Sequence, residues 1–406
     1  MRNCQFCGAP LSQVFADLGH QPPSNSFLTE EQLNLPEVSY PLKVFVCSAC
    51  WLVQIPETKR ASDIFNDDYV YYSSQSPANV SHAKKYVEMM CRRFGYGPGK
   101  HIFEIGSNDG YLLQWFQAAG CFVQGIDPAD GPRQIAEERG IPTLHGFFDS
   151  KTASALSMKF DLICGINVLA HQPHINDFVK GMKIALAPEG IITHEFPHLM
   201  RLVEGCQFDT IYHEHYSYFS LMTVCEIFAR HGLEIFDVDE IPEHGGSLRI
   251  YAQHRDTGIH KLHHHVPILL SKEIDKGMNR LAYYQNFSQR VKKIKADLMA
   301  FLIDCAKNGR TVAGYGAPAK ANTLLGYCGI KSDLLPFTVD RSPYKQNKYL
   351  PGSHIRVTDG EELKRYKPDY VIILPWNLKE EIMAQLSYIR EWNGKFVVAI
   401  PRLGVL

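Results

Sequence analysis

The chain has 406 residues, of which 45% are hydrophobic and 21% charged, with a formal net charge of -1 at pH 7. This length predicts two or three domains, and the composition excludes a largely disordered chain. The near-zero charge offers no overall attraction to nucleic acid or an anionic membrane, and no apolar stretch approaches the roughly 20 residues that span a bilayer.

The first sixty residues predict a metal site. The chain begins MRNCQFCGAP, without the basic start and apolar run of a secretory signal, so we expect a cytoplasmic protein. An odd total of eleven cysteines favours metal ligation and free thiols over disulfides. Two C-x2-C pairs share one spacing, and four thiolates so spaced fit tetrahedral, structural zinc; the alternative is a set of ordinary buried cysteines. The candidate ligands are Cys4, Cys7, Cys47 and Cys50.

The next region alternates helices with apolar strands. Helices are predicted over 79–94, 111–120 and 176–186, and strands over 101–106, 121–128, 160–169 and 190–196. Alternation at this spacing predicts a parallel sheet with helices on both faces.

The last region predicts one or two long helices over 266–308 and then a second α/β series. Its apolar strands lie within 311–325, 334–340, 370–376 and 396–401, and residues 341–360 are expected to form a polar loop. We therefore expect an α/β protein with a small zinc-binding module (1–70), a Rossmann-like core (71–265) and a second Rossmann-like α/β domain (266–406).

A cofactor site is predicted at EIGSNDG (104–110), between a strand and a helix. Glycine there lets the backbone approach a ligand, and the helix N-terminus presents free N–H groups. The G-x-x-x-G spacing differs from the G-x-G-x-x-G of a dinucleotide fold and resembles the first motif of class I methyltransferases, which bind S-adenosylmethionine. Asp127, ending the next strand, offers acceptors for a ribose diol. The candidates are Glu104, Gly106, Asn108, Gly110 and Asp127, with Phe148 near the adenine or simply in the core.

A reacting site is predicted in FDTIYHEHY (208–216), which concentrates two carboxylates, two imidazoles and two phenols. Such a cluster is an unusual way to build a core, because each buried polar group needs a partner. Residues 213 and 215 would face away from 212 and 214 on a regular strand, so a site that uses both sets requires a turn or loop here.

A glycine turn with a nearby lysine follows the strand at 311–313 and predicts a binding site for the substrate's pyrophosphate or sugar. The alternative is a plain Rossmann-like turn. The candidates are Gly316, Lys320, Asp340, Lys345 and Asn347.

These motifs, together with NVLAH (167–171), YHEH (212–215) and HGG (244–246), resemble in content and order the sugar C-3 methyltransferases of deoxysugar biosynthesis. The resemblance covers the whole chain. It implies methylation of C3 in a 4-keto-6-deoxy sugar linked to thymidine or guanosine diphosphate, through a base-generated enolate. It also implies that His215 is the base, that Tyr212, Glu214, His171 and Tyr71 complete the catalytic site, that Asn167 contacts the cofactor, and that His244 and Gly245 contact the sugar.

Two other functions remain open from the sequence. One is an S-adenosylmethionine-dependent O- or N-methyltransferase of another small molecule, which needs no carbon-acid base. The other is a zinc-ribbon binding protein with vestigial catalytic domains. We expect no nucleic-acid or membrane partner and a monomer or weak dimer.

Overall fold

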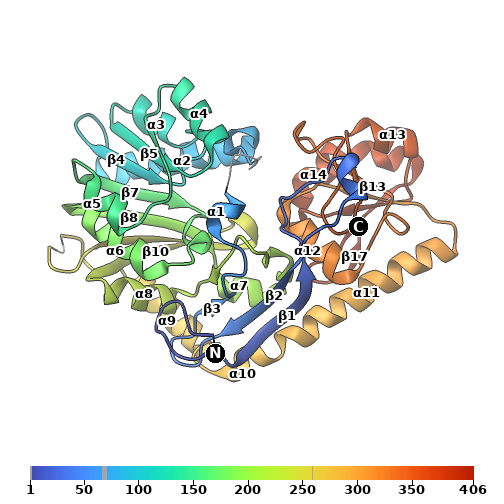
Figure 1. Cartoon of the computed structure of the whole chain (residues 1–406), viewed down its shortest axis with the longest axis horizontal. Coiled ribbons are helices and arrows are strands. Elements are labelled where there is room, and N and C mark those ends of the chain that lie inside the picture. Colours follow the sequence, from blue (N-terminus) through green and yellow to red (C-terminus); the bar gives the residue numbers. More distant parts are fainter. Residues whose placement is uncertain (1, 66–70, 258) are drawn as a thin grey trace.

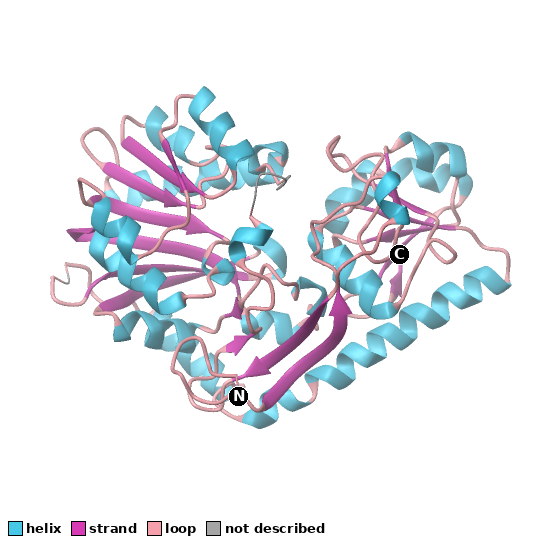
Figure 2. Cartoon of the chain, in the orientation of Figure 1, coloured by secondary structure: helices cyan, strands magenta, loops and turns pink. Residues whose placement is uncertain are grey.

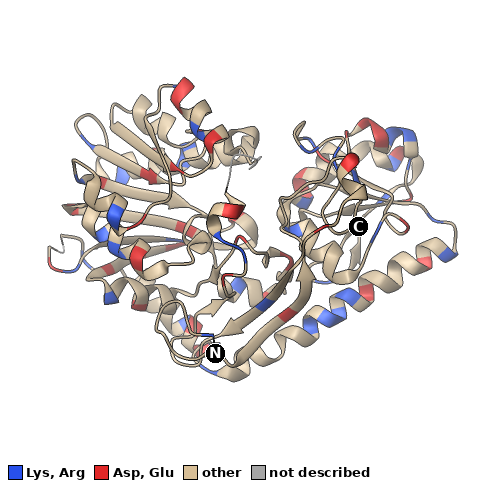
Figure 3. Ribbon diagram, viewed as in Figure 1, with Lys and Arg blue, Asp and Glu red and all other residues tan. Residues whose placement is uncertain are grey.

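The computed structural model describes residues 2–65, 71–257 and 259–406 (Figure 1). The predicted domain boundary at residue 70 and the segment Asp68–Val70 lie outside these residues. In the three described ranges, no helix has the length and apolar character needed to cross a membrane. Basic and acidic residues are interspersed on both α/β parts of the chain (Figure 3).

The core is a seven-stranded sheet with helices on both faces (Figure 2). In spatial order its strands are β10 (Leu233–Ile241), β11 (Ser247–His254), β8 (Leu186–Pro197), β7 (Phe160–Ile166), β4 (His101–Ile105), β5 (Phe122–Asp127) and β6 (Thr143–His145). The apolar residues of one face pack against α2 (Pro77–Phe94), α3 (Leu113–Ala118) and α4 (Asp130–Glu138). Those of the other face pack against α5 (Ser150–Ala155), α6 (Ile175–Ala185), α8 (Leu221–Arg230) and α9 (His265–Asp275).

The strands predicted for the core, β4, β5, β7 and β8, pair in parallel as expected, but the sheet also contains β10 and β11, which were not predicted. β4 to β8 pair in parallel, but β11 is antiparallel to both β8 and β10. The reason is the short connection between β10 and β11, because only antiparallel strands can be joined without a long crossover.

The cysteine-containing module is built around a second sheet, of four strands, which a strand from outside the module completes. Its order is β1 (Gln13–Gln21), β2 (Tyr40–Val46), β3 (Val53–Gln54) and β9 (Ser217–Tyr218). Short helical turns flank it at η1 (Glu31–Asn34), α1 (Ala61–Ile64) and η2 (Ser73–Gln75). Because β9 directly follows the predicted catalytic segment, this sheet anchors that segment.

Three helices, and not the one or two predicted, connect the core to the C-terminal sheet. α9 is followed by α10 (Leu281–Gln285) and α11 (Phe287–Lys307). At the break, the Tyr284 hydroxyl donates to the carbonyl oxygen of Met278 over 2.6 Å, which satisfies an acceptor that a continuous helix would have used. α11 then runs beneath the molecule along β1 (Figure 1).

The third sheet has six strands. Its order is β14 (Arg356–Thr358), β13 (Phe337–Val339), β12 (Val312–Tyr315), β15 (Tyr370–Ile373), β16 (Lys395–Val398) and β17 (Gly404–Val405). Its helical elements are α12 (Ala319–Cys328), α13 (Glu361–Tyr366), η6 (Trp376–Leu378), α14 (Lys379–Gln385) and η7 (Ser387–Trp392). The predicted loop 341–360 therefore contains a strand, β14, which pairs in parallel with β13.

One apolar cluster joins the three parts of the chain. It contains buried side chains of β1 and β2, of residues 199–218, of α11 and α12, and of β15 and β16. The predicted catalytic segment thus lies where the zinc module, the methyltransferase core and the C-terminal domain meet.

Candidate active site

A cavity of about 400 Å³ opens at the carboxyl ends of the parallel core strands. β4 and β7 are neighbours there although β5 and β6 intervene in the chain, and such switch points are where open α/β sheets bind ligands. Side chains from the zinc module (Phe65) and the C-terminal domain (Asn377 and Leu378) also line it. The predicted residues that line it are Tyr71, Gly106, Asn108, Asp127, Phe148, Asn167, His171 and His244.

The turn after β4 is shaped to admit a ligand. A Cβ on Gly106, whose φ is +68°, would lie 2.6 Å from Val168, so a larger residue does not fit. The Asp127 carboxylate accepts from the backbone N–H of Asn108 and of Ala129, each at 2.9 Å. A carboxylate has about four lone-pair sites, so acceptors remain for a diol on the cavity side. Burial raises the pKa of Asp127 to about 6.

Asn108 holds a wall of the cavity in place. Its side-chain oxygen accepts from the Ser73 N–H at 2.7 Å, and its Nδ2 donates to the Tyr71 carbonyl oxygen at 3.0 Å. The Tyr71 hydroxyl accepts from Nδ2 of Asn79 at 3.1 Å. The segment that carries Tyr71 is therefore tied to the predicted cofactor turn.

Two predicted cofactor residues lie behind this turn, because neither is among the described residues that line the cavity. Gly110 packs under the turn, where a Cβ would lie 3.1 Å from Ile141. Glu104 is 0% exposed, and within the described ranges neither of its oxygens has a hydrogen-bond partner. Burial raises the pKa of Glu104 well above its usual range, so the carboxyl needs a proton or a cationic partner.

Phe148 lies at the boundary between the cavity and the core. It lines the cavity, and its ring also lies 5.7 Å from Phe103 and 5.6 Å from Phe178 within the core.

A charged cluster on the cavity wall was not predicted from the sequence. His82 places Nε2 2.6 Å from a Glu195 oxygen and Nδ1 3.0 Å from a Glu243 oxygen, and Arg249 pairs with Glu195 at 2.7 Å. Although burial acts in the opposite direction, the Glu195 carboxylate raises the pKa of His82, so the imidazole is held as a cation between two carboxylates. The sequence could have indicated this cluster through Glu195, which lies near the carboxyl end of β8 and beside the end of β7.

The imidazoles of His171 and His215 stack with ring centroids 5.0 Å apart. The Tyr212 ring lies 4.1 Å from that of His215. Nδ1 of His215 lies 2.9 Å from the Thr210 carbonyl oxygen, so Nδ1 carries the proton and Nε2 carries the lone pair. Burial, and then the neighbouring His171, lower the pKa of His215 well below its usual range, so the ring is neutral near pH 7.

A turn at the YHEH box separates its side chains, as predicted. Glu214 is buried, and one of its oxygens accepts from Nδ2 of Asn25, in the zinc module, at 2.7 Å. Burial raises the pKa of Glu214 to about 7. His213 instead packs against Tyr40, with ring centroids 5.9 Å apart. Glu214 and His213 therefore contact different residues of the zinc module.

The HGG box approaches both the core and the C-terminal domain. Nδ2 of Asn167 lies 2.9 Å from Nε2 of His244, so the two predicted ligand-binding residues contact each other. A Cβ on Gly245 would lie 2.6 Å from Trp376 of η6, which explains why a glycine is needed here.

Lys320 lies where the C-terminal domain meets the core. Its Nζ donates to Oδ1 of Asn377 at 2.7 Å and sits 4.6 Å from the centre of the Trp376 ring. The Trp376 indole N–H donates to Asp209 at 2.7 Å, and the Thr323 hydroxyl of α12 donates to the Ile211 carbonyl oxygen at 2.8 Å. α12 is thus fixed to the predicted catalytic segment.

None of the predicted C-terminal residues is among the described residues that line the cavity: Gly316, Lys320, Asp340, Lys345 and Asn347. The Asp340 carboxylate accepts from the Ala317 N–H at 2.7 Å, and Lys345 donates to the Ala317 carbonyl oxygen at 3.0 Å. The backbone N–H that would face a phosphate in this turn is therefore already used by a carboxylate. Gly316 is required by packing, since a Cβ there would lie 2.5 Å from Pro375.

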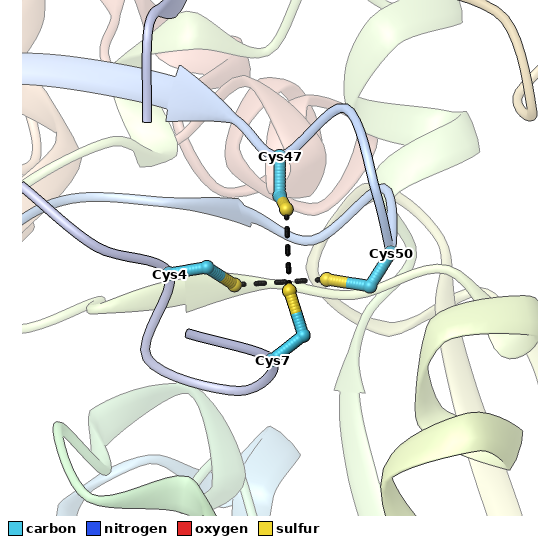
Figure 4. Close-up of side chains that lie close together, drawn as sticks. All are labelled: Cys4, Cys7, Cys47 and Cys50. Atoms are coloured by element: carbon cyan, nitrogen blue, oxygen red, sulfur yellow. Dashed lines mark hydrogen bonds between the residues drawn. The ribbon is translucent and has the colours of Figure 1, made fainter. Parts of the chain in front are cut away.

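The four predicted zinc ligands converge (Figure 4). The sulfur atoms of Cys4 and Cys50 lie 3.6 Å apart, those of Cys7 and Cys47 lie 3.5 Å apart, and all four lie within 4.8 Å of one another. Sulfurs around a tetrahedral zinc at about 2.3 Å lie about 3.8 Å apart, so this set fits the ion. The Thr223 hydroxyl of α8 donates to the Cys50 carbonyl oxygen at 3.2 Å, which ties the site to the core.

Comparison with known proteins gives three family matches. A family described as "C-methyltransferase C-terminal domain" matches residues 242–401, one described as "Putative zinc binding domain" matches residues 4–65, and one described as "Methyltransferase domain" matches residues 84–238.

The C-methyltransferase NovU of Streptomyces niveus is 33% identical over 406 residues, which cover 99% of this chain and 96% of that protein. A ubiquinone biosynthesis O-methyltransferase of Actinobacillus pleuropneumoniae serotype 7 is 32% identical over 104 residues, covering 23% of this chain and 44% of its own length. A solved S-adenosylmethionine-dependent methyltransferase of Mesorhizobium loti has 14% identity and a TM-score of 0.36, covering 43% of this chain and 99% of its own. The match to NovU extends over all three parts of the chain.

Proposed function

The chain belongs to the C-methyltransferase family that includes NovU and is an S-adenosylmethionine-dependent methyltransferase with a zinc-binding module, and we propose that it methylates C3 of a nucleotide-linked 4-keto-6-deoxy sugar. The proposal rests above all on one observation: the buried His215 ring, whose Nδ1 faces the Thr210 carbonyl oxygen, stacks on His171, which lines the cavity. A carbon next to a ketone must lose its proton before it can attack a methyl group, so C-methylation requires a base near the substrate.

We propose that Gly106, Asp127 and Asn167 hold the cofactor. Gly106 lines the cavity and has no side chain to fill it, and the Asp127 carboxylate would accept from the ribose hydroxyls. The buried Glu104 carboxyl lies behind this turn and would act on the cofactor only through the turn's charge and shape. When bound, S-adenosylmethionine supplies an electrophilic methyl group.

The proposed reaction begins with proton transfer. Nε2 of His215 removes the C3 proton, and the electron pair of the C–H bond moves toward the C4 carbonyl, whose oxygen becomes the enolate oxygen. The Thr210 carbonyl oxygen, which accepts a hydrogen bond from Nδ1, stabilises the positive charge of the imidazolium that forms. The Tyr212 hydroxyl is a donor beside this ring, and burial raises the pKa of Tyr212 well above its usual range, so it stays protonated.

The remaining predicted residues have supporting roles in this proposal. Tyr71 closes the cavity, and His171 holds the His215 ring by stacking. His244 and Gly245 contact the sugar near Asn167. Asp340 and Lys345 keep the shape of the Gly316 turn through Ala317.

The test is incubation with S-adenosylmethionine and a panel of dTDP- and GDP-linked 4-keto-6-deoxy sugars, with the product read by mass spectrometry. We expect one methyl group on C3 of at least one sugar. The matched control is the same sugar with a C4 hydroxyl in place of the ketone, which cannot form an enolate. Methylation of the control at an equal rate would contradict the mechanism, and transfer to oxygen or nitrogen would indicate a different methyltransferase.

A further inference from the structure

A charged side chain of the C-terminal domain, Lys320, lies behind a residue that lines the active-site cavity and is not itself among the described lining residues. Lys320 lies in the first turn of α12, and its ammonium group donates to Oδ1 of Asn377, a residue that lines the cavity, over 2.7 Å. An ammonium group has three donors, so this contact leaves donors for a further partner. The Trp376 ring, 4.6 Å away, shields one side of the charge.

A buried carboxylate accompanies this cation. Asp209 is 0% exposed and accepts from the Trp376 indole, while its other oxygen has no hydrogen-bond partner in the described part of the chain. Burial lowers the pKa of Lys320, and the Asp209 charge opposes that shift. The Asp209 charge therefore helps to keep Lys320 protonated, although the ammonium group of Lys320 is largely shielded from water.

The cation and the proposed base are linked through Trp376 and the segment 209–210. Burial and His171 are the main causes that lower the pKa of His215, and the Lys320 charge acts in the same direction. Asp209 also directly precedes Thr210, whose carbonyl oxygen holds the His215 ring. Lys320, Asp209 and His215 thus belong to one connected unit that spans the domain interface.

We infer that Lys320 is the cation that stabilises the enolate oxygen at C4, with Asp209 as its positioning residue, so that the C-terminal domain completes the reacting site. This inference rests on the proposed function and assigns Lys320 to the reacting sugar instead of the pyrophosphate.

The step balances without a further reactant. His215 takes the C3 proton, and the electron pair of the C3–H bond forms the C3=C4 double bond of the enolate. The π pair of the C4 carbonyl moves to the C4 oxygen, and Lys320 donates a hydrogen bond to that oxygen without losing its proton. A donor aimed at charge that develops only during the reaction accelerates deprotonation more than it strengthens binding.

The experiment measures exchange of the C3 hydrogen in deuterated water, with S-adenosylhomocysteine in place of the methyl donor and the keto sugar at saturation. We expect Lys320→Met to slow exchange by roughly 10²- to 10³-fold, the range seen when one oxyanion donor is removed. Its affinity for the free nucleoside diphosphate should match that of the wild type. Lys331→Met, a change at an exposed lysine of the same domain, is the matched control and should exchange normally.

Two results would overturn the inference while leaving the proposed function intact. One is an unchanged exchange rate at saturation in Lys320→Met. The other is a weakened affinity for the free nucleoside diphosphate with normal exchange, which would make Lys320 a pyrophosphate anchor. If the wild type exchanges with no sugar of the panel, the proposed function fails and the inference fails with it.

A second variant tests the same inference if Lys320→Met does not fold. Asp209→Asn removes the charge that opposes the lowering of the Lys320 pKa. The alkaline limb of the exchange rate against pH should therefore move to lower pH. An unchanged alkaline limb would overturn the role of this pair.

Discussion

Nδ1 of His215 donates a hydrogen bond to the carbonyl oxygen of Thr210 over 2.9 Å. A carbonyl oxygen can only accept, so this contact decides which nitrogen of the imidazole carries the proton. Nε2 is left with its lone pair, in a ring that burial keeps neutral. The backbone of the turn thereby prepares the proposed base before any substrate binds.

His215→Asn should lower turnover by roughly 10²- to 10⁴-fold, because a general base contributes about that much. The asparagine amide can still donate to the Thr210 carbonyl, so substrate and cofactor should bind as before. Steady-state kinetics and calorimetry would show this pattern. His213→Asn is the matched control, since His213 packs against Tyr40 and not against His171. If the His215 variant exchanged the C3 hydrogen at the wild-type rate, Glu214 would become the candidate base.

Glu214→Gln should stabilise the protein at pH 8 more than at pH 5. Burial raises the pKa of Glu214 from 4.5 to about 7, so the folded state binds more protons than the unfolded state between those values. The stability of the wild type therefore falls as pH rises from about 4.5 to about 7 and is level above. Glutamine removes this penalty, which amounts to up to roughly 3 kcal/mol, and can still accept from Asn25.

Denaturant unfolding of both proteins at pH 5 and pH 8 measures the Glu214 effect. Equal differences in the free energy of unfolding at the two pH values would show that Glu214 does not titrate in this range.

Asp127→Asn should weaken S-adenosylmethionine binding by roughly 10- to 100-fold, the equivalent of losing hydrogen bonds to a charged group. Alanine is less suitable, because it would leave the buried N–H groups of Asn108 and Ala129 without acceptors. Calorimetry on folded protein measures the affinity. Asp130→Asn, at the half-buried start of α4, serves as control. Undiminished affinity in the Asp127 variant would remove this carboxylate from the cofactor site.

Cys47→Ser should abolish stoichiometric zinc binding and reduce turnover as well as thermal stability. The zinc site is tied to α8 through Cys50, and β3 pairs with β9 directly after the catalytic turn. Metal analysis, a thermal melt and an activity assay at a temperature where the variant is folded separate the three effects. Cys225→Ser, at a half-buried cysteine of α8, should keep its zinc. Wild-type protein purified without chelator and free of zinc would contradict the assignment.

The features that the sequence predicted by itself are local in the chain. The C-x2-C pairs predicted the zinc ligands, because the two cysteines of each pair are close in sequence. The strand–glycine–helix pattern predicted that Gly106 and Asn108 follow the end of β4. A site that used side chains of both parities in 208–216 required a turn, and the chain turns at residues 213–214. In each case the chemistry depends on residues a few positions apart, so spacing was enough.

Only the tertiary structure decided which distant residues meet. Asn25 reaches Glu214, Trp376 reaches Asp209, and His82 reaches Glu195, because a shared apolar core folds the zinc module and α12 onto the catalytic segment. The hydrophobic periodicity of the two segments that meet does not predict such a contact. The same holds for the Gly316 turn, where the sequence suggested a phosphate site and the fold supplies the Asp340 carboxylate to the Ala317 N–H. Packing between segments far apart in the chain, and not local propensity, determines these contacts.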